Sequence, residues 1–197
     1  MPVSLLPSFL LYCYVGAITP GPANLCSLSA ALRYGSKAAL KQWRGIFVGY
    51  AIVSLSSAVV TWLLGAALNE YVRLLSWVGA AYILYLAWHM LRSAGLQIDN
   101  DPAAPCFRTG VLVQLTNVKI MIYCLTAMSG YVLPYSRDFR HLLAVGLFLP
   151  FTGPVCNLLW LFAGASLQKL FSNHRKAVDV IMALSLAVCA VSLVWPH

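Results

Sequence analysis

Charged side chains are scarce in this sequence: Asp, Glu, Lys and Arg make up only 9% of its 197 residues, and only 5 residues are acidic. A soluble globular domain carries about 25% charged residues, so this chain cannot cover an ordinary water-exposed surface. With 61% hydrophobic residues and a mean hydropathy of +0.80, it has more apolar side chain than one core can hide. The composition excludes a water-soluble protein and indicates an integral membrane protein.

The sequence lacks several common metal-binding and nucleotide-binding motifs. The six cysteines form no CxxC pair and no Cys/His zinc spacing, so we expect unpaired thiols and no metal site. The sequence contains no GxxxxGK[ST] nucleotide-binding loop, and we expect no cofactor. The net charge of +8 is spread over single or small groups of basic residues, which argues against a nucleic-acid partner. The uncharged first 30 residues lack the basic region of a signal peptide and should be retained as a helix.

Six apolar stretches alternate with short segments that hold nearly all the charges. They lie at about residues 5–32, 45–68, 72–92, 107–133, 141–168 and 177–195. An open sheet could not satisfy its backbone in lipid, so the pattern predicts an all-α membrane protein with about six transmembrane helices. Residues 1–197 should form a single polytopic domain in the lipid bilayer, because the short connections leave no room for another.

The basic residues also predict the orientation of the helices. Nine lie in the first, third and fifth connections and three on the opposite side. Cytoplasmic loops carry the excess of Lys and Arg, so both termini should be periplasmic. The nine are Arg33, Lys37, Lys41, Arg44, Arg92, Arg108, Lys169, Arg175 and Lys176, and the three are Arg73, Arg137 and Arg140.

A polar linker at about residues 95–105 separates two halves, at about residues 1–94 and 106–197. With three helices before the linker, the second triplet enters the membrane from the opposite side, as in two inverted three-helix repeats. Six unrelated helices are the alternative. Unusual residues near the middle of the first helix of each half favour the repeat, because discontinuous helices at matching places are typical of a transporter binding site.

The first of these helices is interrupted by TPGPANLC, residues 19–26. Pro20 and Pro22 lack a backbone N–H, and Gly21 relaxes the chain between them, so carbonyl oxygens are freed in a medium where an unsatisfied group costs several kcal/mol. A substrate ammonium, a water or a nearby side chain has to donate hydrogen bonds to these carbonyl oxygens. The alternative is that the segment is only a structural kink. The local candidates are Thr19, Asn24 and Ser27.

The fourth helix contains Lys119, about a dozen residues from either end of its apolar stretch. A lysine there costs roughly 2.5–3.5 kcal/mol on insertion scales and is too deep to reach the membrane surface, so it must face the protein interior or a water-filled cavity. It either caps the carbonyls freed in the first helix or binds a substrate carboxylate. Two further amides lie at membrane depth. Asn117 is in the fourth helix, and Asn157 follows a Gly-Pro break in the fifth.

Two further features concern packing and protons. Gly45 and Gly49 form a GxxxG motif at the start of the second helix, which predicts close helix packing within the chain or in a homodimer. Asp179 is the acid that adjoins the last apolar stretch and could accept a proton, or it simply marks the cytoplasmic end of a helix.

Three segments carry a resemblance to a known family: TPGPANLC, the string GAAYILYLAW at residues 79–88 and the TNVK segment. With them the chain resembles the LysE/RhtB family of amino-acid exporters over essentially its whole length. The family motif is commonly Asn-Pro-Lys, and Val118 instead matches the subgroup that exports cysteine and O-acetylserine. The resemblance implies a non-enzymatic exporter of small neutral amino acids in the bacterial inner membrane, coupled to protons. The site residues that it implies are Pro20, Gly21, Pro22, Asn24, Asn117 and Lys119.

Two other functions are alternatives to export. A membrane relay for thiol reducing power would use one cysteine in each half, and Cys26 and Cys124 occupy roughly matching places. Neither has a neighbouring proline or a group that clearly stabilises a thiolate apart from Lys119 near Cys124. A non-transporting scaffold would keep a costly buried lysine without a use. Both are less consistent with the residues than an exporter.

Overall fold

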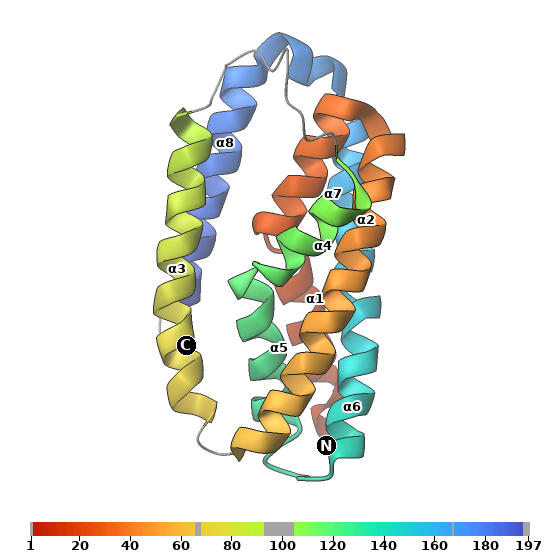
Figure 1. The fold of residues 1–197 in the computed structure, drawn as a ribbon, viewed down its shortest axis with the longest axis vertical. Coiled ribbons are helices and arrows are strands. Elements are labelled where there is room, and N and C mark those ends of the chain that lie inside the picture. Colours follow the sequence, from red (N-terminus) through yellow and green to blue (C-terminus); the bar gives the residue numbers. More distant parts are fainter. Residues whose placement is uncertain (1, 66–67, 93–104, 167, 195–197) are drawn as a thin grey trace.

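The computed structural model describes residues 2–65, 68–92, 105–166 and 168–194, and its regular elements in these ranges are all helical (Figure 1). They are η1 (Val3–Leu5), α1 (Leu6–Ile18), α2 (Pro22–Leu64), α3 (Leu68–Arg92), α4 (Phe107–Leu115), α5 (Val118–Tyr131), α6 (Phe139–Phe148), η3 (Leu149–Phe151), α7 (Gly153–Ser166) and α8 (Gln168–Val194). The predicted all-α class is confirmed. The predicted linker at 95–105 lies almost entirely outside the described residues.

Some helices of the fold are long and apolar, as expected for a membrane protein. Among the described residues, Pro22–Leu64 and Phe139–Ser166 are long and apolar enough to cross a membrane. The pair Phe107–Leu115 and Val118–Tyr131 passes the same test as one span that bends by 58°. The chain is therefore an all-α membrane protein in which the helix pair α4 and α5 bends sharply at its break.

The first connection differs from the expected polar loop. Residues 33–44 are helical within α2, and the chain turns at Gly35, where φ is 81° and ψ is 169°. Glycine adopts this positive φ without the cost that a Cβ would impose, so a single residue absorbs the whole turn. The Ala- and Lys-containing sequence after it favours helix, and Lys37, Lys41 and Arg44 lie exposed on its surface.

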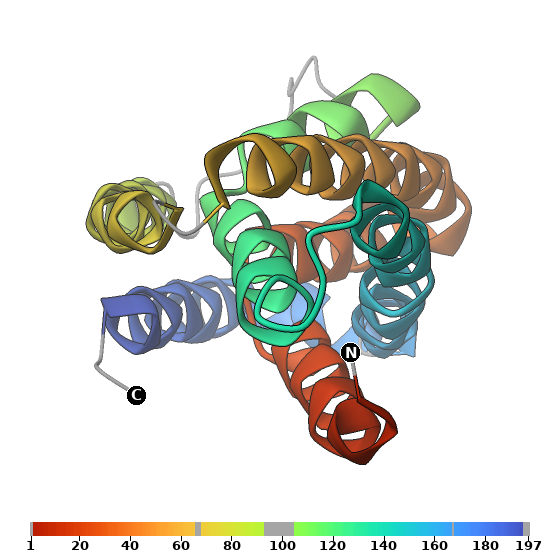
Figure 2. The ribbon, with the colours of Figure 1, turned by 90° about the horizontal axis from the view of Figure 1, so that it is seen from below.

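The helices form two packed groups. In Figures 1 and 2, α3 and α8 lie side by side along one flank of a larger group made by α1, α2 and α4 to α7. Apolar side chains join α3 to α8, and Leu25 of α2 packs in the same cluster. An ion pair of 2.8 Å between Arg33 and Asp179 also ties α8 to α2, and the Asp179 side chain is buried in it. The acid singled out in the sequence is thus part of a helix-to-helix contact.

Glycines bring α2 and α4 into backbone contact. A Cβ added to Gly45 would collide with the Phe107 carbonyl oxygen, and a Cβ on Gly110 would collide with the Gln42 carbonyl oxygen. At Gly49 the nearest atom to an added Cβ would be Cβ of Gln114, at 2.8 Å. The GxxxG motif therefore serves close packing within the chain, and this crossing fixes α4 against the second part of α2.

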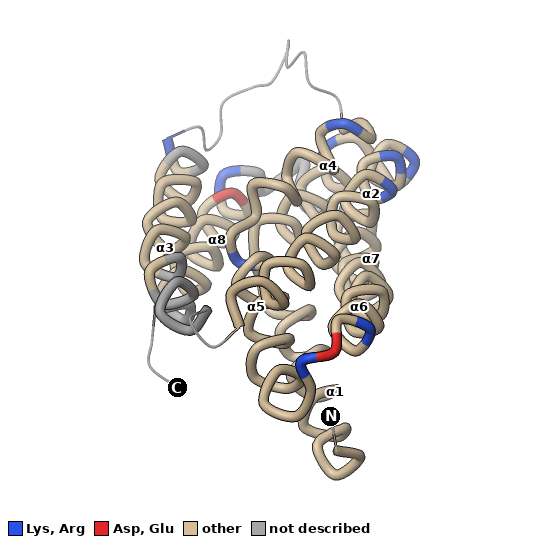
Figure 3. The backbone as a smooth tube through the Cα atoms, turned by 60° about the horizontal axis from the view of Figure 1, so that its bottom comes forward, with Lys and Arg blue, Asp and Glu red and all other residues tan. Residues whose placement is uncertain are grey.

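The two ends of the helical bundle differ in charge. Figure 3 shows most of the described basic residues at the end where α2 bends and α4 begins. The N-terminus of α1, the C-terminal end of α2 and the connection from α5 to α6 lie at the opposite end (Figure 1). Most of the described Lys and Arg residues are therefore gathered at a single end of the bundle.

Candidate functional site

The break between α1 and α2 leaves a run of backbone carbonyl oxygens without helical partners, and polar side chains donate hydrogen bonds to them. The bonds run from Asn24 Nδ2 to the oxygens of Ala17 (3.0 Å) and Thr19 (2.9 Å), from Thr19 Oγ1 to Gly16 (2.9 Å) and from Trp160 Nε1 to Ile18 (3.1 Å). Thr19 and Asn24 thus act as the sequence predicted. Ser27 does not, because its hydroxyl donates to Asn157 Oδ1 at 2.7 Å instead.

Lys119 reaches the same break from α5. Its ammonium donates to Thr19 O (3.0 Å), Thr19 Oγ1 (2.8 Å) and Pro20 O (3.1 Å), so each of its protons has a partner. Gly21 leaves room for this contact, since an added Cβ would lie 2.9 Å from Lys119 Cδ and 3.2 Å from Nζ. The capping role weighed for Lys119 is therefore present in this conformation.

A second break separates α4 from α5 just before Lys119. Thr116 Oγ1 bonds back to Leu112 O at 2.9 Å, and Asn117 is the residue that precedes α5. The Asn117 amide donates to Gln114 Oε1 at 3.2 Å. Such local side-chain bonds compete with the helical ladder, which accounts for the break at Thr-Asn. Lys119 consequently lies in the first turn of α5, in the middle of the bent pair.

A third irregular segment precedes α7. The chain passes through η3, Thr152 Oγ1 donates to Leu149 O at 2.8 Å, and α7 then begins at Gly153. Asn157 on α7 donates to Ala23 O (3.1 Å) and to Asn24 Oδ1 (2.8 Å). Asn157 therefore ties α7 to the start of α2, next to the first break.

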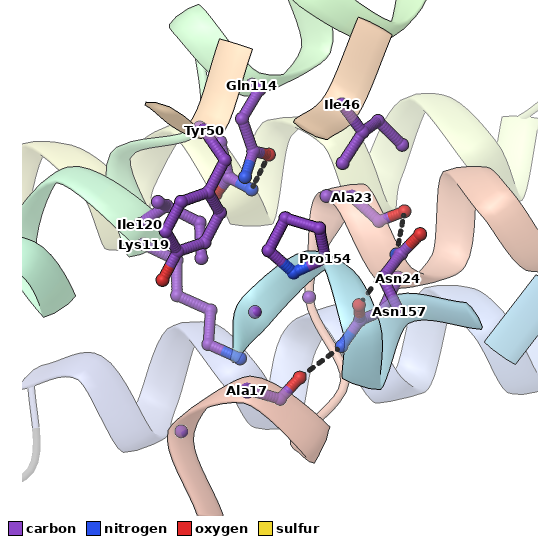
Figure 4. A pocket seen from close by; sticks show the side chains of 14 residues that line it. Ala17, Ala23, Asn24, Ile46, Tyr50, Gln114, Lys119, Ile120, Pro154 and Asn157 are labelled. Atoms are coloured by element: carbon purple, nitrogen blue, oxygen red, sulfur yellow. Dashed lines mark hydrogen bonds between the residues drawn. The ribbon is translucent and has the colours of Figure 1, made fainter. Parts of the chain in front are cut away.

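The three breaks enclose one cavity (Figure 4). Five residues predicted from the sequence line it: Gly21, Asn24, Asn117, Lys119 and Asn157. Thr19 and Pro20 contact the lysine, and Pro22 opens α2 beside them. The cavity volume is about 20 Å³, enough for about one water molecule and too small for an amino acid.

Sequence reasoning missed Tyr50, which lines the cavity from the second part of α2. Its ring lies against Gly153, where an added Cβ would collide with it. A tyrosine directly after the GxxxG motif was the available signal, but a lone tyrosine in an apolar helix is usually a packing residue. Trp43 was missed as well; its indole N–H donates to Pro154 O at 2.8 Å and satisfies a carbonyl beside the third break.

A few polar groups, one of them cationic, lie among the apolar residues that line the cavity. One ammonium, several amides and the ends of broken helices surround it, and no Asp or Glu is among its described lining residues. An ammonium beside helix breaks can hold a carboxylate, while backbone and side-chain oxygens can hold an ammonium. This arrangement suits a zwitterion and offers nothing that would select a second positive charge.

The family described as LysE type translocator matches residues 14–196 of the chain. Three similar proteins, each named cysteine/O-acetylserine efflux protein, come from Salmonella choleraesuis strain SC-B67, Klebsiella pneumoniae and Escherichia coli strain K12. Each is 35% identical to this chain, over 191, 194 and 196 residues. These matches cover 97%, 98% and 99% of this chain and 98%, 99% and 100% of the relative. No solved structure gives a significant match.

Proposed function

We propose, because the chain belongs to the LysE family of translocators, that it exports small neutral amino acids such as cysteine and O-acetylserine across a bacterial inner membrane. The names of its relatives supply the substrates. The observation that carries the proposal is the Lys119 ammonium, held at a cavity between two broken helices. A lysine at membrane depth is costly and is most simply retained for a substrate or an ion.

The hydrogen bonds of Lys119 support a mechanism based on exchange of partners. With all three protons bound to Thr19 and Pro20, the ammonium is satisfied while the cavity is closed. A substrate carboxylate entering an enlarged cavity would replace these carbonyls as the acceptor, because an ammonium bonds more strongly to an ionised carboxylate than to a neutral carbonyl oxygen. The released carbonyl oxygens of the first break are then available to the substrate ammonium. One ion pair would thus couple substrate binding to movement of α5 against α1 and α2.

Alternating access is proposed to use the two halves as inverted repeats. The breaks at Thr19–Gly21 and Thr116–Asn117 fall in the first helix of each half and meet through Lys119, which supports this arrangement. Energy is proposed to come from the proton gradient, as the family resemblance implies.

The proposed orientation, with periplasmic termini and six crossings, predicts the activity of reporters. Alkaline phosphatase, which is active only in the periplasm, should be active when fused after His197, whereas green fluorescent protein should fluoresce when placed next to Lys41. The excess of basic residues at the end of the bundle where α2 bends is the physical reason. Phosphatase activity next to Lys41, or its absence after His197, would reverse the orientation or change the number of crossings.

Export also predicts that the thiols are dispensable. Cys26 accepts a hydrogen bond from Gln42 Nε2 at 3.3 Å, and Cys124 is fully buried, so neither is presented to a partner thiol. Cys26→Ser and Cys124→Ser should each retain most efflux of O-acetylserine, and oxidation should trap no disulfide between the two positions. Loss of efflux in both variants together with a trapped disulfide would support the thiol relay.

Inverted membrane vesicles test the function itself, because their cytoplasmic face points outward and export appears as uptake. Vesicles that contain the protein should accumulate labelled cysteine and O-acetylserine above control vesicles, and an uncoupler should reduce this accumulation. Uptake no greater than in control vesicles for every small neutral amino acid would refute the proposal, and accumulation that an uncoupler leaves unchanged would refute proton coupling alone.

A further inference from the structure

Two residues that line the cavity each have a buried polar atom without a hydrogen bond of normal geometry to the described residues: the hydroxyl of Tyr50 and Oδ1 of Asn117. The two residues are 1% and 2% exposed, so bulk water does not reach them. Buried polar groups in native proteins are almost always bonded, and each exception calls for an explanation. Since both atoms belong to residues that line the same cavity, a ligand in that cavity is the simplest explanation.

The other polar groups around the cavity are committed to the protein. Lys119 holds the first break, and the amides of Asn24 and Asn157 bond each other and the backbone of α1 and α2. In Figure 4, Tyr50 and Lys119 lie on one side of the cavity, and Asn24 and Asn157 lie on the other. Lys119, Asn24 and Asn157 are therefore already bonded within the protein, while Tyr50 and Asn117 each keep one unbonded polar atom.

Packing holds both unsatisfied groups in place. The Tyr50 ring lies against Gly153, and the Cys124 sulfur near its hydroxyl is only a weak hydrogen-bonding group, so no hydrogen bond of normal geometry holds that hydroxyl. The Asn117 amide nitrogen is bound to Gln114, which leaves its oxygen as the unpaired acceptor. The space available would hold about one water molecule, so a substrate that fills it has to supply the hydrogen bonds that a water could make there.

We infer that Tyr50 and Asn117 form a subsite for the substrate side chain, which recognises a polar atom at the γ position of a small amino acid. The inference rests on the proposed function and adds the determinant of its specificity. The Tyr50 hydroxyl donates to a γ oxygen or sulfur, and Asn117 Oδ1 accepts from a γ hydroxyl or thiol. Cysteine and serine satisfy both groups, and the ester oxygen of O-acetylserine satisfies Tyr50. An apolar analogue such as 2-aminobutyrate, with a methyl group at the same place, leaves both unpaired.

The test compares labelled serine with labelled 2-aminobutyrate in inverted vesicles that contain the parent protein or Tyr50→Phe. The parent should take up serine in preference to 2-aminobutyrate. Tyr50→Phe keeps the ring against Gly153 and removes only an unpaired hydroxyl, so it should accumulate normally in the membrane. Its ratio of serine to 2-aminobutyrate uptake should fall about tenfold, as expected for one hydrogen bond to the substrate.

Tyr123→Phe is the matched control. Its hydroxyl donates to Cys13 O at 3.1 Å, so this variant loses a bond inside the protein and should lower the amount of folded protein without changing the ratio. If Tyr50→Phe accumulates poorly, Asn117→Leu gives a second measurement, and it should reduce the preference for serine over O-acetylserine. An unchanged ratio in Tyr50→Phe, or a parent without preference for serine, overturns the subsite and leaves the exporter intact. A parent that carries no amino acid overturns the proposed function first, and the subsite with it.

Discussion

Replacing Lys119 with methionine should abolish efflux while the protein still inserts into the membrane. Methionine is similar in length but has no charge, and removing a charge from membrane depth gains roughly 2.5–3.5 kcal/mol on insertion scales. This gain offsets the loss of the hydrogen bonds from Lys119 to Thr19 and Pro20. The Thr19 carbonyl oxygen still accepts a hydrogen bond from Asn24 in the variant. Without the ammonium, a buried substrate carboxylate has no cation. Efflux per folded molecule should therefore fall by about a hundredfold or more.

Lys119→Arg separates a charge requirement from a geometric one. Arginine keeps the charge but is wider and planar, and Gly21 leaves little room beneath the lysine stem, since an added Cβ would already lie 2.9 Å from Lys119 Cδ. The arginine variant should also transport poorly. A purely structural lysine predicts the opposite pattern, in which Lys119→Met lowers the amount of folded protein and the surviving molecules still transport. Near-parental activity per folded molecule would remove Lys119 from the site.

Gly110→Ala should strongly reduce the amount of folded protein. The added Cβ would collide with the Gln42 carbonyl oxygen, and a backbone atom cannot rotate away as the end of a side chain can. Separating α2 from α4 disturbs the contact that fixes the second break beside the first. We expect a loss of about 3 kcal/mol, the upper part of the range for overpacking. The folded fraction in detergent, followed by size exclusion, gives the measurement.

Gly130→Ala provides the matched control, because no atom of another described element lies within 4 Å of an added Cβ. This variant should fold as well as the parent, or slightly better, because alanine favours helix over glycine. Equal folded fractions for the two variants would show that α2 and α4 can move apart without cost, contrary to the packing described here.

The sequence predicted the breaks because their causes are local. Pro20 and Pro22 interrupt a helix wherever they occur, and Asn117 competes with its own backbone, so both signals can be read without knowing the fold. Lys119 could be placed in the interior from its depth alone. The hydrogen-bond partners of Lys119 could not be predicted, because they depend on how α5 packs against α1. No local sequence pattern gives that packing.

Residues whose role depends on packing between distant segments could not be predicted. Tyr50 stands out only because Gly153, more than a hundred positions later, holds its ring and leaves its hydroxyl unpaired. Trp160 is an ordinary aromatic in an apolar helix until its N–H is seen to reach Ile18 O. The predicted first loop failed for a different reason, because Gly35 turns the chain in one residue and the segment after it is long enough to stay helical.

Counterflow in liposomes that contain only the purified protein is the most direct test of the central claim, that Lys119 binds the amino acid during transport. Liposomes loaded with unlabelled O-acetylserine should transiently concentrate external labelled O-acetylserine when they contain the parent protein. Liposomes with the same amount of folded Lys119→Met should not. The account is contradicted if the parent shows no counterflow with any small neutral amino acid, or if Lys119→Met exchanges O-acetylserine as fast as the parent does.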